Sequence, residues 1–225
     1  GYDEGVEEGV SNAGGVIAET ARVLDITENG IYTSRYSNES EFIVGGTSQV
    51  TGIYDDGTEF YDTAVLEGTL IPLNIVPTVD SRIELWYLPN KPHMGDGFHR
   101  VLHSKKGQIS FVFGGGGVDN KSINLKFGNK SVDYTPTKSF GTEWLHIIVD
   151  RNGATVNDVE MPFDSQATFS KTEVDLYING GSDMGLVGRL ANGTYGMVKI
   201  DGTTFIPKEG GYLNLTTNEL CPFVQ

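Results

Sequence analysis

Residues 173–178 read Glu-Val-Asp-Leu-Tyr-Ile, and apolar and polar side chains alternate along them. The apolar residues Val174, Leu176 and Ile178 occupy the even positions, and the remaining residues occupy the odd ones. Because successive side chains of a β-strand point to opposite faces, the alternation predicts a strand with one buried face and one face in water.

Short segments of this kind recur from residue 65 to the end of the sequence, with turn residues between them. They cover residues 82–88, 99–103, 109–113, 122–127, 131–134, 144–150, 155–159, 173–178, 185–189 and 194–200. Glycine, at 30 residues, far exceeds proline, at 8, without a collagen-like period, which indicates many turns. Ten short strands without a helical period predict an all-β domain, a sandwich or barrel, over residues 66–225.

Residues 1–24 differ in pattern from the rest of the chain. Glycine recurs there at every fourth position among acidic residues, and an apolar trace near helical spacing follows. The glycines weaken a lone helix, so we expect a short helix that self-associates, most simply as a homotrimer, and the alternative is a frayed tail. The residues expected at this oligomer contact are Ala13, Val16, Ile17, Ala21 and Leu24.

Residues 25–65 are predicted to form a small β connector between the helix and the main domain. Three dipeptides in it favour turns, namely Asn29-Gly30, Gly45-Gly46 and Asp56-Gly57. The chain of 225 residues, 38% of them hydrophobic, is long enough for one large domain with this appendage.

The formal net charge of −14 argues against a nucleic-acid partner, which requires clustered lysine and arginine. Residues 1–70 hold 14 acidic and 2 basic residues, and residues 71–225 hold 16 and 14, so the acidity is concentrated near the N-terminus. The sequence contains no run of about 18 apolar residues, so we expect no membrane-inserted segment. The single cysteine, Cys221, excludes an internal disulfide and a multi-cysteine zinc site.

Several segments resemble known families. Residues 24–33, Leu-Asp-Ile-Thr-Glu-Asn-Gly-Ile-Tyr-Thr, resemble an element frequent in tail proteins of phages that infect gut bacteria. Residues 75–84, 144–149, 176–180, 196–200 and 206–217 together resemble the laminin-G-like, concanavalin A-like domains of bacteriophage tail or head fibres and gut bacterial surface proteins. The resemblance implies a jelly-roll sandwich used for binding, located in the virion or on a bacterial cell surface. This superfold also hosts enzymes, so the fold alone does not decide the function.

One enzymatic pattern deserves comparison. Laminarinase-type glucanases of this fold carry a Glu-x-Asp-x-Glu or Glu-x-Asp-x-x-Glu run in which the first glutamate is the nucleophile and the last is the general acid. Glu173 and Asp175 match its first two positions, but Tyr177 stands where the acid is required. A neutral tyrosine with a pKa near 10 is a poor proton donor, so we expect no enzymatic activity and no catalytic residue. Glu173 and Asp175 are then expected to be solvated residues on the outer face of a strand.

No metal or cofactor is expected. His93, His99 and His103 lie near Asp96, but their spacing matches no zinc motif and indicates a basic loop. The glycines at 114–117 lack the ending of a phosphate-binding loop. A calcium ion at the sandwich edge stays an open alternative, with ligands from the set Asp80, Asp119, Asn120 and Asp183.

A sugar-binding domain requires an exposed aromatic ring with hydrogen-bonding groups around it. The candidates are Tyr87, His99, Tyr134 and Tyr195. Trp86 and Tyr87 are adjacent and point to opposite faces of a regular strand, so we expect Trp86 in the core and Tyr87 at the surface, with Trp144 in the core as well.

Three functions remain open at this point. The first is a virion fibre module that adheres to a host cell-surface glycan or protein. The second is a structural domain for trimerisation, which contacts only copies of itself and other virion proteins. The third is a degenerate glycoside hydrolase.

Overall fold

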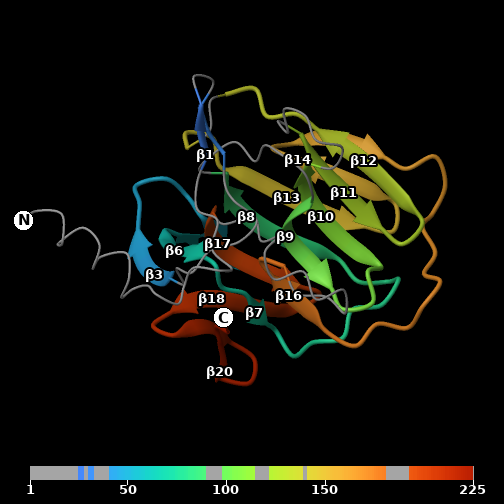
Figure 1. Cartoon of the computed structure of the whole chain (residues 1–225). Coiled ribbons are helices and arrows are strands. Elements are labelled where there is room, and N and C mark those ends of the chain that lie inside the picture. The colour runs from blue at the N-terminus through green and yellow to red at the C-terminus, as the bar shows by residue number, and fades with distance from the viewer. Residues whose placement is uncertain are drawn as a thin grey trace, which may run out of the picture.

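The computed structural model describes residues 25–27, 30–32, 41–89, 98–114, 122–138, 141–180 and 193–224. These residues form strands and turns without a helix, and every strand pairing among them is antiparallel (Figure 1). The all-β prediction is therefore confirmed for this part of the chain. The helix expected in residues 1–24 and the strand expected at 185–189 lie outside the described residues.

A six-stranded sheet forms one layer. In spatial order its strands are β12 (Lys130–Tyr134), β11 (Ile123–Phe127), β10 (Ile109–Gly114), β9 (Phe98–Ser104), β16 (Leu176–Ile178) and β7 (Ile71–Pro72).

A ten-stranded sheet forms the second layer. Its main path runs through β15 (Val159–Pro162), β14 (Gly153–Val156), β13 (Leu145–Asp150), β8 (Ile83–Leu88), β17 (Gly193–Ile200), β18 (Thr203–Lys208), β19 (Gly211–Asn214) and β20 (Glu219–Pro222). On one side β17 pairs with β8, and on the other it pairs first with β6 (Asp62–Glu67) and then with β18. The edge strand β3 (Glu41–Gly46) pairs with β6, so β3 and β6 extend this sheet. The division expected between residues 65 and 66 falls inside β6.

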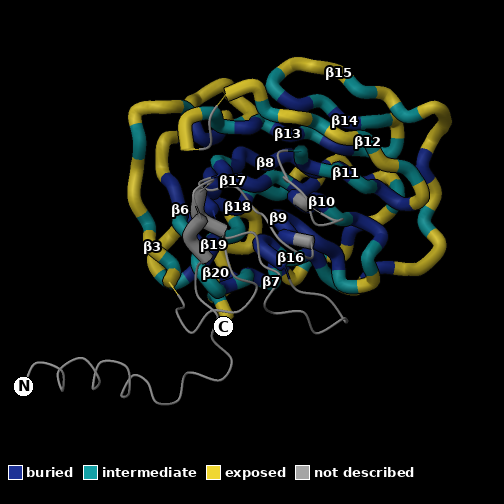
Figure 2. Tube along the Cα trace, turned by 45° about the horizontal axis from the view of Figure 1, so that its top comes forward, coloured by how far each residue is buried: buried dark blue, intermediate teal, exposed yellow. Residues whose placement is uncertain are grey.

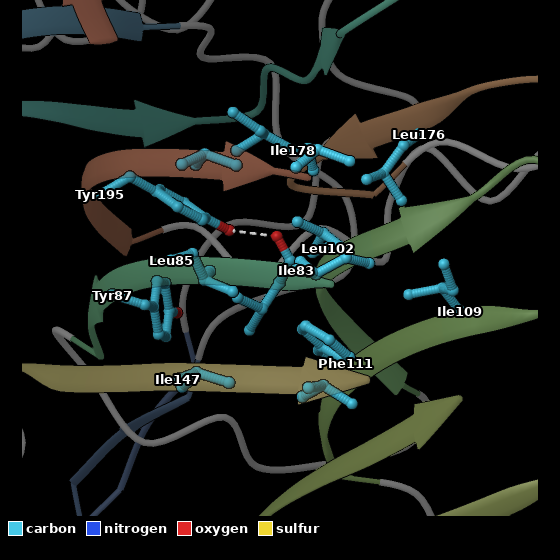
Figure 3. Close-up of a cluster of buried hydrophobic side chains, with 14 of the residues drawn as sticks. Ile83, Leu85, Tyr87, Leu102, Ile109, Phe111, Ile147, Leu176, Ile178 and Tyr195 are labelled. Carbon is cyan, nitrogen blue, oxygen red and sulfur yellow. Dashed lines mark hydrogen bonds between the residues drawn. The ribbon is translucent and has the colours of Figure 1, made fainter. Parts of the chain in front are cut away.

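The two sheets share one hydrophobic core, as in a β-sandwich. Inward residues of the ten-stranded sheet, such as Ile83, Leu85 and Ile147, belong to the same buried cluster as Leu102 and Phe111 of the six-stranded sheet (Figure 3). In Figure 2 the buried residues follow the central strands β8 and β17, and exposed residues gather on the outer loops. Burial of alternate apolar residues on both inner faces is what holds the two layers together.

Two small hairpins complete the described part: β1 (Asp25–Thr27) with β2 (Gly30–Tyr32), and β4 (Gly52–Ile53) with β5 (Glu59–Phe60). The turn predicted at Asp56-Gly57 connects β4 and β5, and Gly57 has a φ of 89° there. Close to this hairpin, Met197 N donates to Thr51 O at 2.8 Å, and a Cβ on Gly196 would lie 2.1 Å from the same oxygen. A glycine in β17 therefore lets the β4–β5 hairpin approach the outer face of the ten-stranded sheet.

Seven predicted strands are confirmed to within one residue at each end, and they correspond to β8, β9, β10, β11, β12, β13 and β17. The strand predicted at 155–159 is wrong, because Asn157 and Asp158 take φ values of 49° and 70° and form the turn between β14 and β15. The turn predicted at Gly45-Gly46 is also wrong, since both residues lie in β3. The strand predicted at 173–178 begins only at Leu176, and Val174 is exposed instead of buried.

Candidate functional site

Most of the aromatic residues expected at a sugar site are buried. Tyr87 and Tyr195 have no exposed surface, their rings lie 4.8 Å apart in the core, and His99 is 1% exposed. The expectation that Tyr87 is a surface residue is wrong, because Ile83, Leu85 and Tyr87 share the inner face of β8. These three side chains are closed to a sugar ring. Tyr134 is half-buried at the end of β12, so its ring stays partly accessible.

The neighbouring Trp86 does point to the other face of β8, yet it is also buried. Its indole stacks on the imidazole of His146 at 4.1 Å, in a second cluster that contains Phe60 and Met197. Trp144 is half-buried against this cluster instead of lying in the main core. The prediction that Trp86 and Tyr87 point to opposite faces of β8 was correct. Both faces are covered by other residues, so neither face presents an exposed aromatic ring to a sugar.

The two carboxylates of the enzyme-like run hold loops together. Glu173 is 4% exposed and accepts hydrogen bonds from Ser104 Oγ at 2.6 Å, Lys106 N at 2.8 Å and Gln108 N at 2.8 Å. It thereby ties the segment before β16 to the turn between β9 and β10. The expectation that Glu173 is solvated on the outer face of a strand is wrong.

Asp175 is half-buried and is engaged in a similar way. Its Oδ1 accepts hydrogen bonds from Ile75 N at 3.2 Å and from Leu176 N at 2.7 Å. Burial raises the pKa of this carboxyl group, although the backbone donors oppose the shift. Asp175 therefore fixes the loop before β8 against the start of β16, and it too differs from the expected solvated residue.

These contacts bring two loops together at the rim of the sandwich, and a pocket of about 310 Å³ lies between them. We call it the rim pocket. Residues of both loops line it: Val76, Pro77, Thr78, Val79, Phe169, Ser170, Lys171, Thr172 and Glu173. Its wall is mainly aliphatic and aromatic, with three hydroxyl groups and one lysine beside it.

Hydrogen bonds to the backbone hold both loops of the rim pocket in shape. Thr78 N donates to Ser81 Oγ at 2.9 Å, and Ser170 N donates to Gln108 Oε1 at 2.8 Å. Phe169 packs on Phe127 of the six-stranded sheet, with ring centroids 5.2 Å apart. The pocket is therefore built into the fold, as ligand pockets in proteins usually are.

The histidines expected in a basic loop do not converge. His99 pairs with the inward Phe113 and faces the core, whereas His103 pairs with Ser110 and faces outward, so they lie on opposite sides of β9. His93 and Asp96 lie outside the described residues. Within the described ranges, no three histidine, cysteine or carboxylate side chains are grouped as a metal site would require.

The calcium alternative rests mostly on residues that the structure does not describe. Asp119, Asn120 and Asp183 are among these. Asp80 is described, and its Oδ1 accepts a hydrogen bond from Arg151 Nη1 at 2.8 Å.

Cys221 is buried, and burial raises the pKa of its thiol.

One further ionic network lies on the outer face of the ten-stranded sheet. Glu84 is buried and receives hydrogen bonds from His146 Nε2 at 2.7 Å and Arg82 Nη1 at 2.9 Å. Burial raises the pKa of Glu84, but the His146 and Arg82 bonds outweigh it, so the pKa is lowered overall. This network neutralises a buried carboxylate beside Trp86.

No family model matches this chain, and no curated protein sequence matches it either. Among the described residues, no helix is long and apolar enough to span a membrane.

Sequence reasoning did not find the rim pocket. Its residues lie in loops some 90 positions apart in the sequence, and neither the resemblance of residues 75–84 nor the strand-like pattern that begins at Glu173 indicates that the two loops meet. The available signal for a pocket in this loop was weak. Val76 precedes Pro77 in a segment outside any predicted strand, so its apolar side chain has no sheet to pack against.

Proposed function

We propose that this chain is a non-enzymatic recognition module of a virion fibre, with a concanavalin A-like jelly-roll domain that binds a host cell-surface glycan in the rim pocket. The observation that carries the proposal is the pocket itself, a preformed hollow at the edge of a rigid sandwich. Loops held by such a scaffold are where binding residues are most often found.

The chemistry of the pocket suits a sugar. A pyranose presents an apolar C–H face, which can pack on Val76, Val79 and Phe169, and hydroxyl groups, which can pair with Thr78 and Thr172. At about 310 Å³ the pocket lies at the lower end of the range of roughly 300–1,000 Å³ for ligand sites. A terminal sugar unit therefore suits it better than a long oligosaccharide.

The positions of the carboxylates support a binding role over hydrolysis. Retaining glycosidases require two carboxyl groups about 5–5.5 Å apart that face the scissile bond. Here Glu173 is committed to the turn at residues 104–108, and Asp175 is committed to Ile75 N. We expect no sugar release from β-glucans. Release that disappeared in Glu173→Gln would instead assign Glu173 a catalytic role.

The proposal includes assembly through residues 1–24, whose apolar trace from Ala13 to Leu24 requires burial against another chain. A trimer would present three rim pockets on one fibre. Weak binding at each pocket would then combine into strong attachment, because linked sites bind with a high effective concentration.

A glycan array probed with the whole chain tests the proposal. We expect a restricted group of glycans with related terminal sugars to bind, because the pocket wall is mainly apolar and holds one sugar unit. A folded chain that binds no glycan would contradict the proposal and would favour a structural fibre domain.

A further inference from the structure

The outer face of the six-stranded sheet carries a row of polar side chains that crosses five strands. Tyr177 of β16 pairs with His103 of β9, His103 with Ser110 of β10, Ser110 with Lys126 of β11, and Lys126 with Ser131 of β12 (Figure 1). Directly paired residues of antiparallel strands share a face, so all five point the same way. Their neighbours along the strands, such as Leu102, Ile109 and Leu125, point into the core.

His103 is the most buried residue at the centre of this row. It is 4% exposed, whereas Tyr177, Ser110 and Lys126 on either side of it are half-buried. Within the part of the chain that the structure describes, His103 Nδ1 is buried and has no hydrogen-bond partner. A buried ring nitrogen without a partner is costly and rare in native proteins, so its place in the middle of a polar row requires an explanation.

Among the residues that the structure describes, two charged groups act on His103, and both are positive. They are Arg100, on the same face of β9, and Lys126, two strands away. Burial, with Arg100 and Lys126 acting in the same direction, lowers the pKa of His103 to about 4 against the opposing effect of the Ser104 backbone, so the imidazole is neutral at pH 7. Burial also lowers the pKa of Lys126, whose Nζ donates to Gly107 O at 2.8 Å.

Glu173 also acts electrostatically on Lys126, and its carboxylate accepts hydrogen bonds from Ser104, Lys106 and Gln108 at the turn beyond the row. On the row itself, a half-buried lysine lies beside a neutral histidine and hydroxyl groups, which are groups that can hold an anion.

We infer that the row from Tyr177 to Lys126 binds an anionic substituent, a carboxylate or a phosphate, of a glycan. Lys126 supplies the positive charge, and Ser110 and Tyr177 donate hydrogen bonds from their hydroxyl groups. His103 donates from Nδ1, because the ligand favours the tautomer that carries its proton on Nδ1. The row and the rim pocket border the same turn at residues 104–108, so one acidic glycan can reach both. The identification of the ligand as a glycan rests on the proposed function, whereas the anion site stands without it.

The test is a titration of the whole chain with galacturonate, galactose and inorganic phosphate, followed by NMR of the histidine ring nitrogens. Galacturonate and galactose differ mainly in the carboxylate, and phosphate separates the two anion chemistries. We expect at least one anion, and not galactose, to shift the His103 signals and raise its titration midpoint, because an anion stabilises the imidazolium.

Substitutions locate the effect on the sheet face. Lys126→Gln should weaken binding of the effective anion by about tenfold or more, because it removes a charge-assisted hydrogen bond. Lys208→Gln at the end of β18 is the matched control, because this exposed lysine lies outside both the row and the rim pocket, and it should leave the affinity unchanged. Far-ultraviolet circular dichroism of each variant confirms that it is folded.

The outcomes separate this inference from the proposed function. Unmoved His103 signals with both anions, or equal losses in Lys126→Gln and Lys208→Gln, would overturn the anion site even if the array finds neutral glycans. A shift of the His103 signals that depends on Lys126, combined with an array that shows no bound glycan, would keep the anion site and remove the glycan. A response to galacturonate alone assigns a carboxylate, and a response to phosphate alone assigns a phosphate.

Discussion

Glu173→Gln is the substitution that most sharply separates a structural carboxylate from a catalytic one. In the wild-type chain, Oε2 accepts from Ser104 Oγ and Gln108 N, and Oε1 accepts from Lys106 N. A glutamine can place its amide oxygen at only one of these positions. Its NH₂ group then faces a backbone N–H, and the remaining hydrogen bonds lose the charge of their acceptor.

The magnitude follows from the number of bonds. Hydrogen bonds to a charged group contribute about 1.5–3 kcal/mol each and neutral ones about 0.5–1.5 kcal/mol, so one lost bond and two weakened bonds amount to several kcal/mol. Relief of the burial of a charge offsets part of this loss. We expect the free energy of unfolding to fall by about 2–4 kcal/mol.

The assay is guanidinium unfolding followed by tryptophan fluorescence, with Glu160→Gln as the control. Glu160 is exposed on the edge strand β15, so its substitution should change stability by no more than about 0.5 kcal/mol. Equal unfolding midpoints for the two variants would refute the structural role of Glu173.

Further predictions concern the core, the hairpin, acid stability and assembly. Tyr195→Phe removes the buried hydroxyl that donates to Val101 O at 2.7 Å (dashed line in Figure 3) and should cost about 1–3 kcal/mol in the same unfolding assay. Gly196→Ala places a methyl group 2.1 Å from Thr51 O and should displace the β4–β5 hairpin, seen as faster hydrogen exchange at Phe60, whereas Gly202→Ala meets no atom within 4 Å and should not. Because the pKa of His103 is about 4 in the folded chain, the unfolded chain takes up the proton first as pH falls below about 6.5, so the wild type should lose about 2 kcal/mol more stability than His103→Gln between pH 7 and pH 5. Deletion of residues 1–24 should shift the mass measured by light scattering at moderate salt from trimer to monomer without changing the circular dichroism of the β domain.

The sequence predicts the strands well where one face of a strand packs on the core and the other is polar. Such alternation locates β11 and β13 to within one residue. It fails at residues 155–159, Thr-Val-Asn-Asp-Val, because Asn157 and Asp158 interrupt the alternation and adopt the positive φ that a tight turn requires. Asparagine and aspartate tolerate this conformation better than most residues, which was the available signal.

The sites were harder to predict, because they depend on contacts between distant segments. The alternation of Glu173 and Val174 is that of a strand, yet the turn at residues 104–108 offers donors that draw Glu173 into the interior. The alternation of side chains along a strand correctly predicts that Trp86 and Tyr87 point to opposite faces of the sheet. It cannot indicate that a hairpin near residues 51–60 covers the outer face. The rim pocket forms only where two loops distant in the sequence meet, so no local sequence pattern predicts it.

Binding in the rim pocket is tested most directly by calorimetric titration of the strongest array ligand into the wild type, Val76→Trp and Val159→Trp. Val76 is 55% exposed and lines the pocket, and Val159 is 50% exposed on the distant strand β15, so both accept a tryptophan without disturbing the core. We predict that Val76→Trp fills the pocket and abolishes measurable binding, while Val159→Trp binds as the wild type does. Equal affinities in all three proteins would contradict the assignment of the rim pocket as the glycan site.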